Sequence, residues 1–147
     1  MTDYIFSFDR MLSLQGNTAP YLQNAYVRIC SIFRKAGPSR TGGWESGNAA
    51  VTKVDELTLA EATELGLAKK LCQFAEIVPQ VLHDFRPNIL ANYLFELANS
   101  FHTFYEACPV LKADDPTRSS RLALCALTGR VLRRGLKLLG IDVPERM

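Results

Sequence analysis

Apolar residues recur at spacings of three and four along most of this chain, and this helical period constrains the fold more than any other feature. It is clear over residues 17–36, where Asn17 or Thr18 can cap the N-terminus and Pro20 fits the first turn. The apolar positions on one face of this segment are Leu22, Ala25, Tyr26, Ile29, Ile32, Phe33 and Ala36. We therefore predict a helix that buries this face in a core.

The same period predicts further helices. One covers residues 57–72 and another covers residues 77–85, where Pro79 is tolerable only in the first turn. Pro87 ends that segment and opens the longest helix, which Pro109 stops. No segment offers a partner strand, so we predict an all-α bundle of four to five helices.

A cation-rich helix is predicted near the C-terminal end. Asp115 can cap it, Pro116 fits its first position, and Gly140 ends it in the left-handed conformation. Between residues 117 and 139 the segment has no carboxylate and six cations, which are Arg118, Arg121, Arg130, Arg133, Arg134 and Lys137. These cations form either a solvated face or a surface for an anionic partner.

Two segments depart from the helical pattern. Residues 1–16 form a lead-in that is either extended or loosely helical, or else a short strand, because Tyr4, Phe6 and Phe8 alternate with other residues. Residues 37–53 form a glycine-rich loop. The loop lacks the spacing of a phosphate-binding loop, and its Trp44 either anchors it to the domain surface or contacts a partner. With 147 residues, the chain is long enough for one domain, to which we assign residues 1–147.

Composition and motif content argue against most chemistry in this chain. Four widely spaced cysteines without a CxxC motif and only two histidines give little support for a metal site. No serine or cysteine has an identifiable basic partner, and the carboxylates are scattered, so we expect no catalytic residues. We also expect a cytoplasmic chain without membrane contact, because it has neither an 18-residue apolar run nor a signal-peptide layout.

A mixed polar strip lies beside the apolar face of the first predicted helix. At about 100° per residue, this flank carries Tyr21, Asn24, Arg28, Ser31 and Lys35. An aromatic ring, an amide and a guanidinium together can stack on an unpaired base and hold a phosphate. They can equally form an ordinary solvated flank, and periodicity does not decide between the two.

Three motifs, in order, resemble the C-terminal anticodon-binding domain of arginyl-tRNA synthetases. They are GNTAPYLQ…VRICSIFRKA in residues 16–36, YLFELANSFHTFYEACPVL in residues 93–111 and RLALCALTGRVLRRGLKLLGIDVPERM in residues 121–147. The resemblance covers nearly the whole chain apart from the 37–53 loop. It implies a helical bundle of the type that class I synthetases attach to a catalytic domain.

The resemblance also implies a function. The family charges tRNA with arginine, and the ATP and Mg²⁺ belong to a catalytic domain whose HIGH and KMSK motifs this chain lacks. We therefore expect a domain that binds the anticodon stem-loop of tRNA(Arg), works with that catalytic domain, holds no cofactor, does not aminoacylate alone and does not bind DNA. A stand-alone helical interaction module derived from such a domain is the alternative.

The residues that match anticodon-contacting positions of the family are Tyr21, Asn24, Arg28, Arg34, Tyr105 and Met147. Asn24 stands where a second tyrosine is common, so a stacking contact is replaced by amide hydrogen bonding or lost. Tyr105 could instead be a core ring with its hydroxyl satisfied, and Arg34 a solvated surface residue.

Overall fold

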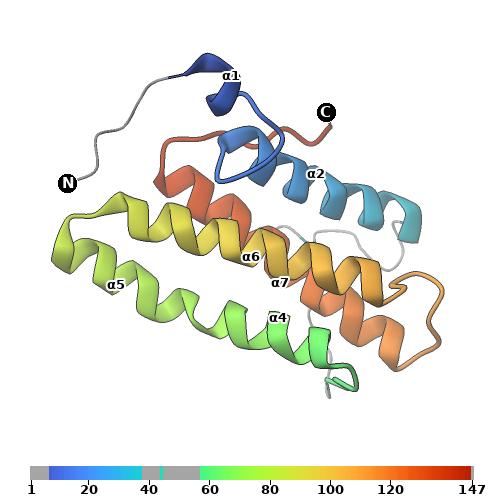
Figure 1. The fold of residues 1–147 in the computed structure, drawn as a ribbon. Coiled ribbons are helices and arrows are strands. Elements are labelled where there is room, and N and C mark those ends of the chain that lie inside the picture. The colour runs from blue at the N-terminus through green and yellow to red at the C-terminus, as the bar shows by residue number, and fades with distance from the viewer. Residues whose placement is uncertain (1–6, 38–43, 45–56, 147) are drawn as a thin grey trace.

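The computed structural model describes residues 7–37, 44 and 57–146 (Figure 1). Its helices are α1 (Phe8–Met11), α2 (Ala19–Ala36), α4 (Ala62–Cys72), α5 (Phe74–Asp84), α6 (Pro87–Ala107) and α7 (Thr117–Leu138). No strand occurs in these residues, so the predicted all-α bundle is confirmed. Of the lead-in, Phe8–Met11 is a single helical turn and residues 1–6 lie outside the described part.

Helix α6 is the central helix of the bundle. It packs against α2, α4, α5 and α7, and Figure 1 shows it running between α2 on one side and α4 and α5 on the other. Leu94, Leu97, Phe101 and Phe104 of α6 are completely buried, at spacings of three and four residues. Burying aliphatic and aromatic side chains of this size is the main favourable term in forming the bundle.

Helix α2 forms as its sequence predicts. The Thr18 hydroxyl accepts a hydrogen bond from the backbone N–H of Tyr21 at 3.3 Å, and Pro20 lies in the first turn. The predicted apolar face is buried from Leu22 to Phe33, and it packs against α6 and α7. The polar strip of α2 is therefore left along the rim of the bundle.

Trp44 anchors its segment to the bundle. Its side chain is buried and stacks on Phe33, with the ring centroids 4.5 Å apart. A Cβ atom added to Gly129 of α7 would lie 2.6 Å from the Trp44 ring, so only glycine fits there without a shift. Apart from Gly37 and Trp44, the predicted 37–53 loop lies outside the described residues.

Two predicted helix starts need correction. Helix α4 begins at Ala62 rather than Leu57, because Glu61 and Glu64 form a reciprocal capping box that fixes its first turn. Helix α5 begins at Phe74 rather than Ile77, so Pro79 lies inside the helix instead of in its first turn. The earlier start places the Phe74 ring 5.9 Å from the ring of Tyr93 on α6.

Arg121 is not part of a free cationic face. It is buried, and its Nε donates to Oε1 of the fully buried Glu64 of α4 at 2.6 Å, while Nη1 donates to the Pro109 carbonyl at 3.0 Å. Burial acts to raise the pKa of Glu64, but hydrogen bonds from the Glu61 N–H, Arg121 and the Ala60 N–H outweigh it and lower the pKa. This ion pair joins α4, α7 and the segment after α6.

The two ends of the cation-rich helix follow the prediction only in part. Helix α7 begins at Thr117, so Pro116 is its N-cap and not its first residue, and Asp115 does not cap it. The C-terminal end is as predicted, because Gly140 follows the helix in the left-handed conformation with a φ of 75°. Arg118 pairs with Asp115 at 3.0 Å, whereas Arg134 and Lys137 are exposed. Arg118 and Arg121 therefore have carboxylate partners that come from outside the helix.

Candidate nucleic-acid interface

The polar strip of α2 lies against a row of side chains on α6. Tyr21 is half-buried, and its ring packs against the rings of Phe95 and His102, each at a centroid distance of 5.5 Å. Its hydroxyl donates to Oδ1 of Asn99 at 2.5 Å. Burial raises the pKa of the Tyr21 phenol and nearby Arg28 partly offsets this, so the hydroxyl stays protonated and remains a donor at neutral pH.

Arg28 lies two helical turns after Tyr21 and also meets α6. Its Nη1 lies 3.4 Å from Nδ1 of His102, and its guanidinium carbon lies 5.7 Å from the centre of the Tyr105 ring. The second contact has the geometry of a cation–π interaction. These two contacts hold the guanidinium in place, and because Arg28 is exposed, the group is still accessible to a ligand.

Tyr105 is a surface ring and not a core ring. It is 36% exposed and stacks on the buried Phe101, with centroids 6.0 Å apart and an interplanar angle of 29°. One part of the ring is therefore fixed against the core and another faces solvent. Such a ring is suited to stacking with an unpaired base.

A half-open pocket lies beside Arg28 and Tyr105. Its volume is about 340 Å³, and α2, the end of α6 and the segment after α6 form its walls. Ile32 and Val110 are its buried apolar lining residues. The lining also includes three cations and one carboxylate, which are Arg28, Lys35, Lys112 and Glu106. The pocket thus offers apolar surface beside predominantly positive charge.

Three of the predicted site residues come together in one arrangement. His102 contacts both Tyr21 and Arg28, and Arg28 in turn lies over the Tyr105 ring, so we call these four residues the contact row. Asn24 lies on α2 between Tyr21 and Arg28 and is half-buried. The spacing of three and four residues keeps it on the same flank as both neighbours.

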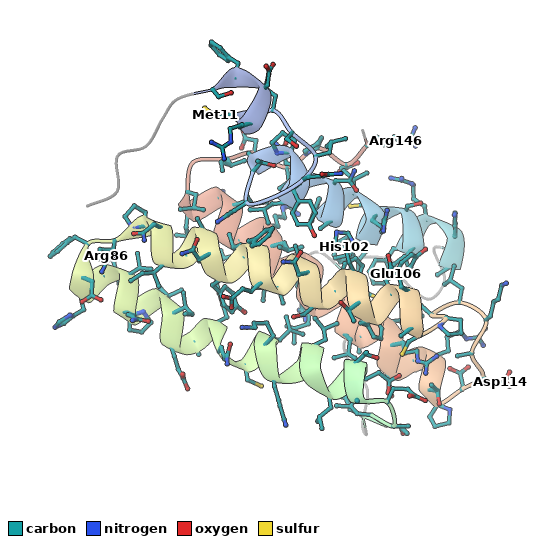
Figure 2. All side chains as sticks on the ribbon, in the orientation of Figure 1. Met11, Arg86, His102, Glu106, Asp114 and Arg146 are labelled. Atoms are coloured by element: carbon teal, nitrogen blue, oxygen red, sulfur yellow. The ribbon has the colours of Figure 1, made fainter. Side chains whose placement is uncertain are left out.

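Arg34 has a different neighbourhood. Its Nη1 donates to the backbone carbonyl of Glu145 at 2.9 Å, and Gln23 Nε2 donates to the carbonyl of Asp142 at 2.7 Å. The segment after α7 therefore runs along α2, and Figure 2 shows Arg146 beside this helix. Met147, the last predicted contact residue, lies outside the described residues.

Sequence reasoning missed His102 and Asn99, which hold the predicted contacts in place. His102 is half-buried, and burial lowers its pKa, as does Arg28, whereas Glu106 opposes them. A signal existed, because Phe95, Asn99, His102 and Glu106 recur at spacings of four, three and four on one flank of α6. Nothing in the sequence alone said that this flank faces the strip on α2.

The described part of the chain offers neither a metal site nor a membrane-spanning helix. No group of three histidine, cysteine or carboxylate side chains comes together there in a way that could hold a metal ion. Within the same residues, no helix is both long and apolar enough to cross a bilayer. The contact row combines aromatic rings with a guanidinium, and the amide of Asn24 lies on the same flank of α2.

Comparisons with known proteins identify the family of this chain. The model of the DALR anticodon binding domain family matches residues 22–147. The arginine–tRNA ligase of a Synechocystis species is 53% identical over 146 residues, which make up 99% of this chain and 24% of that protein. The chain thus spans about a quarter of the length of the relative it matches.

Two solved structures are also similar. The arginyl-tRNA synthetase of Thermus thermophilus has a TM-score of 0.79 and 35% identity, over 97% of this chain and 23% of that one. The arginyl-tRNA synthetase of Plasmodium falciparum has a TM-score of 0.81 and 34% identity, over 99% of this chain and 24% of that one. The bundle of α2 to α7 therefore has the fold of one part of these larger enzymes.

Proposed function

Because this chain belongs to the DALR anticodon-binding domain family, we propose that it binds the anticodon stem-loop of tRNA(Arg) as one domain of an arginine–tRNA ligase. The observation that carries the proposal is the contact row, in which groups from α2 and α6 are held together at the rim of the bundle. Family membership supports the class of ligand, and the row supports the place where it binds.

Residues of the contact row, the neighbouring Asn24 and the adjacent pocket have physical roles in this proposal. The exposed part of the Tyr105 ring stacks on an unpaired loop base, which is worth roughly 1–3 kcal/mol per base. Arg28 contacts phosphate or a base edge, and its fixed position reduces the ordering that binding would otherwise cost. Asn24 supplies donors and an acceptor on the same flank. The adjacent pocket suits an unstacked base because it combines apolar surface with nearby cations.

The remaining parts of the reaction belong to a longer enzyme in this proposal. Activation of arginine with ATP and Mg²⁺ takes place in the catalytic domain of the same synthetase, and this chain holds no cofactor of its own. Its two partners are that domain and the tRNA, and the setting is the cytoplasm. The chain positions the tRNA, since an anchored anticodon arm fixes where the acceptor end is presented.

The test is a titration of the chain with two RNA hairpins at several salt concentrations. Both hairpins share a stem, but one loop carries an arginine anticodon and the other a scrambled sequence. We expect tighter binding to the arginine loop, with an affinity that falls as salt rises. No binding at any salt, or equal binding to both hairpins, contradicts the proposal and favours an interaction module that does not bind RNA.

A charge-matched pair of variants locates the surface. Arg28→Ala should weaken binding and flatten its salt dependence, because one cation is removed from the contact row. Arg86→Ala removes the same charge at the start of α6, where Figure 2 shows Arg86 far from His102 along the helix. At 1.5 Å per residue, Arg86 and His102 are about 24 Å apart along α6. The Arg86→Ala control should therefore bind like the parent chain.

A further inference from the structure

His102 lies between the two α2 residues of the contact row and touches both of them. The Tyr21 ring meets the imidazole edge-on, at 5.5 Å and an interplanar angle of 63°. On its Nδ1 side, the same imidazole lies 3.4 Å from Nη1 of Arg28. Figure 2 shows His102 on the side of α6 that faces α2, with Glu106 one turn further along.

The contact with Arg28 fixes the protonation state of the imidazole. A guanidinium has five N–H donors and no acceptor, so Nδ1 must be the acceptor in this arrangement. The His102 proton then resides on Nε2, and the ring is neutral. The charged and titratable groups that face it are Arg28 and Tyr21 from α2 and Glu106 from α6.

We propose that His102 is a positioning residue for RNA binding, whose neutral imidazole holds the Arg28 guanidinium over the Tyr105 ring and supports the Tyr21 ring. This inference rests on the proposed function. An exposed arginine samples many rotamers, and a fixed acceptor on a rigid helix removes much of that freedom before the ligand arrives. His102 does not need to touch the RNA to act in this way.

Asn99 gives the same kind of support one turn earlier on α6. Its Oδ1 accepts the hydrogen bond from the Tyr21 hydroxyl, so Tyr21 is held at its hydroxyl by Asn99 and at its ring by His102 and Phe95. The flank of α6 thus acts as a template for side chains that start on α2. Rigid support of this kind is what precise contacts require.

Two substitutions separate positioning from packing. His102→Phe keeps an aromatic ring against Tyr21 and Phe101 but removes the acceptor, and we expect arginine-loop binding to weaken about 3- to 10-fold. His102→Asn removes the ring but places an amide oxygen near the former Nδ1, so it should bind more tightly than His102→Phe. A packing role reverses this order, because phenylalanine is the better substitute for buried ring surface.

A double-mutant cycle with Arg28→Ala gives the second readout. If His102 acts through Arg28, the effect of His102→Phe on binding should largely disappear once Arg28 is already alanine. Additive losses in the cycle, or arginine-loop binding by His102→Phe equal to that of the parent chain, overturn the inference. Thermal unfolding of each variant shows whether a change in binding reflects a change in folding.

The pH dependence of the parent chain tests the inference without any variant. Protonation of His102 removes the acceptor and places a second cation beside Arg28. Because burial and Arg28 lower the pKa of His102, the preference for the arginine loop should still be present at the ordinary histidine value of about 6.5 and should fall only at lower pH. The ratio to the scrambled loop cancels the general gain in positive charge. A ratio that does not change with pH overturns the inference alone, whereas no preference at neutral pH overturns the proposed function as well.

Discussion

Polar and aromatic residues at the rim of this bundle are held by neighbouring side chains. Arg28 is exposed, yet it contacts His102 and Tyr105, and the Tyr105 ring is seated on the buried Phe101. A ring or guanidinium that is already fixed loses less conformational entropy when a ligand binds. At the scale of single residues, the proposed function therefore depends on how well each group is held before RNA arrives.

Tyr105 allows the clearest test of stacking. Tyr105→Leu should weaken arginine-loop binding by roughly 1–3 kcal/mol, since the side chain loses the flat face on which a base stacks. Tyr105→Phe keeps the ring and should lose much less, which separates stacking from any contact of the hydroxyl. Fluorescence titration with the labelled hairpin measures both, and equal losses for the two variants would contradict a stacking role.

At the scale of elements, the packing of helices decides which side chains are tolerated at the positions where two helices, or a helix and another segment, are in contact. The buried pair of Glu64 and Arg121 joins α4 to α7, and Gly129 lets α7 pass close to the Trp44 ring. Neither interaction is visible in the helical period of its own segment. Both are consequences of which helices become neighbours in the bundle.

Glu64→Gln should destabilise the fold strongly. The variant leaves the buried Arg121 without its counter-charge, and breaking a buried ion pair in this way typically costs about 3–5 kcal/mol. Urea unfolding measures the loss. Glu96→Gln is the control, because Glu96 pairs with Lys70 on the surface with 59% of its side chain exposed, and it should change stability by about 1 kcal/mol or less.

The same carboxylate sets an acid limit on stability. Since the pKa of Glu64 is lowered in the folded state, its contribution is fully present above the unfolded value of about 4.3 and is lost as the pH falls through the folded value. The difference in unfolding free energy between the parent chain and Glu64→Gln should shrink over that range. A difference that does not change with pH would show that Glu64 is not ionised in the fold.

Two glycines in helices should respond in opposite directions to alanine. In Gly129→Ala the new Cβ would lie 2.6 Å from the Trp44 ring, and this overpacking costs about 1–3 kcal/mol. The higher helix propensity of alanine offsets about 1 kcal/mol of that cost, so the variant should be destabilised by up to about 2 kcal/mol. Gly66→Ala in α4 has nothing within 4 Å of the new Cβ, so it should stabilise by up to about 1 kcal/mol. Thermal unfolding distinguishes them, and stabilisation at both sites would contradict the close packing of Trp44 on α7.

At the scale of the whole molecule, the buried face of α6 is what keeps the other helices in place. The helix contacts α2, α4, α5 and α7, and its completely buried residues include Leu97. The contact row depends on this arrangement because it is assembled from α2 and α6 together. In the proposed function, RNA binding therefore depends on the core for the arrangement of the contact row, without any contact between the core and the RNA.

Leu97→Ala should lower the unfolding free energy by about 2–5 kcal/mol, through lost burial and the cavity that remains. Below its own unfolding temperature, the variant should still prefer the arginine loop. Leu82→Ala removes the same atoms from a side chain that is 68% exposed, so its stability should change by less than about 0.5 kcal/mol. Calorimetry with both variants checks the contrast.

The sequence was sufficient for the fold class and for most helix ends, since apolar period, prolines and caps are local signals. Thr18, Pro87 and Gly140 mark boundaries that the structure confirms. What it could not supply were the interactions between helices. His102 becomes important only because α2 lies beside α6, and Arg121 is buried only because Glu64 faces it from α4. The lateral order of helices is a long-range property that periodicity does not encode.

Two hydrogen bonds hold the segment after α7 against α2 by its backbone. Gln23 and Arg34 donate hydrogen bonds to main-chain carbonyl oxygens at positions 142 and 145. These two bonds therefore do not involve the side chains at those positions. Substituting Asp142 or Glu145 should therefore leave the attachment of this segment in place, whereas substituting Gln23 or Arg34 should loosen it.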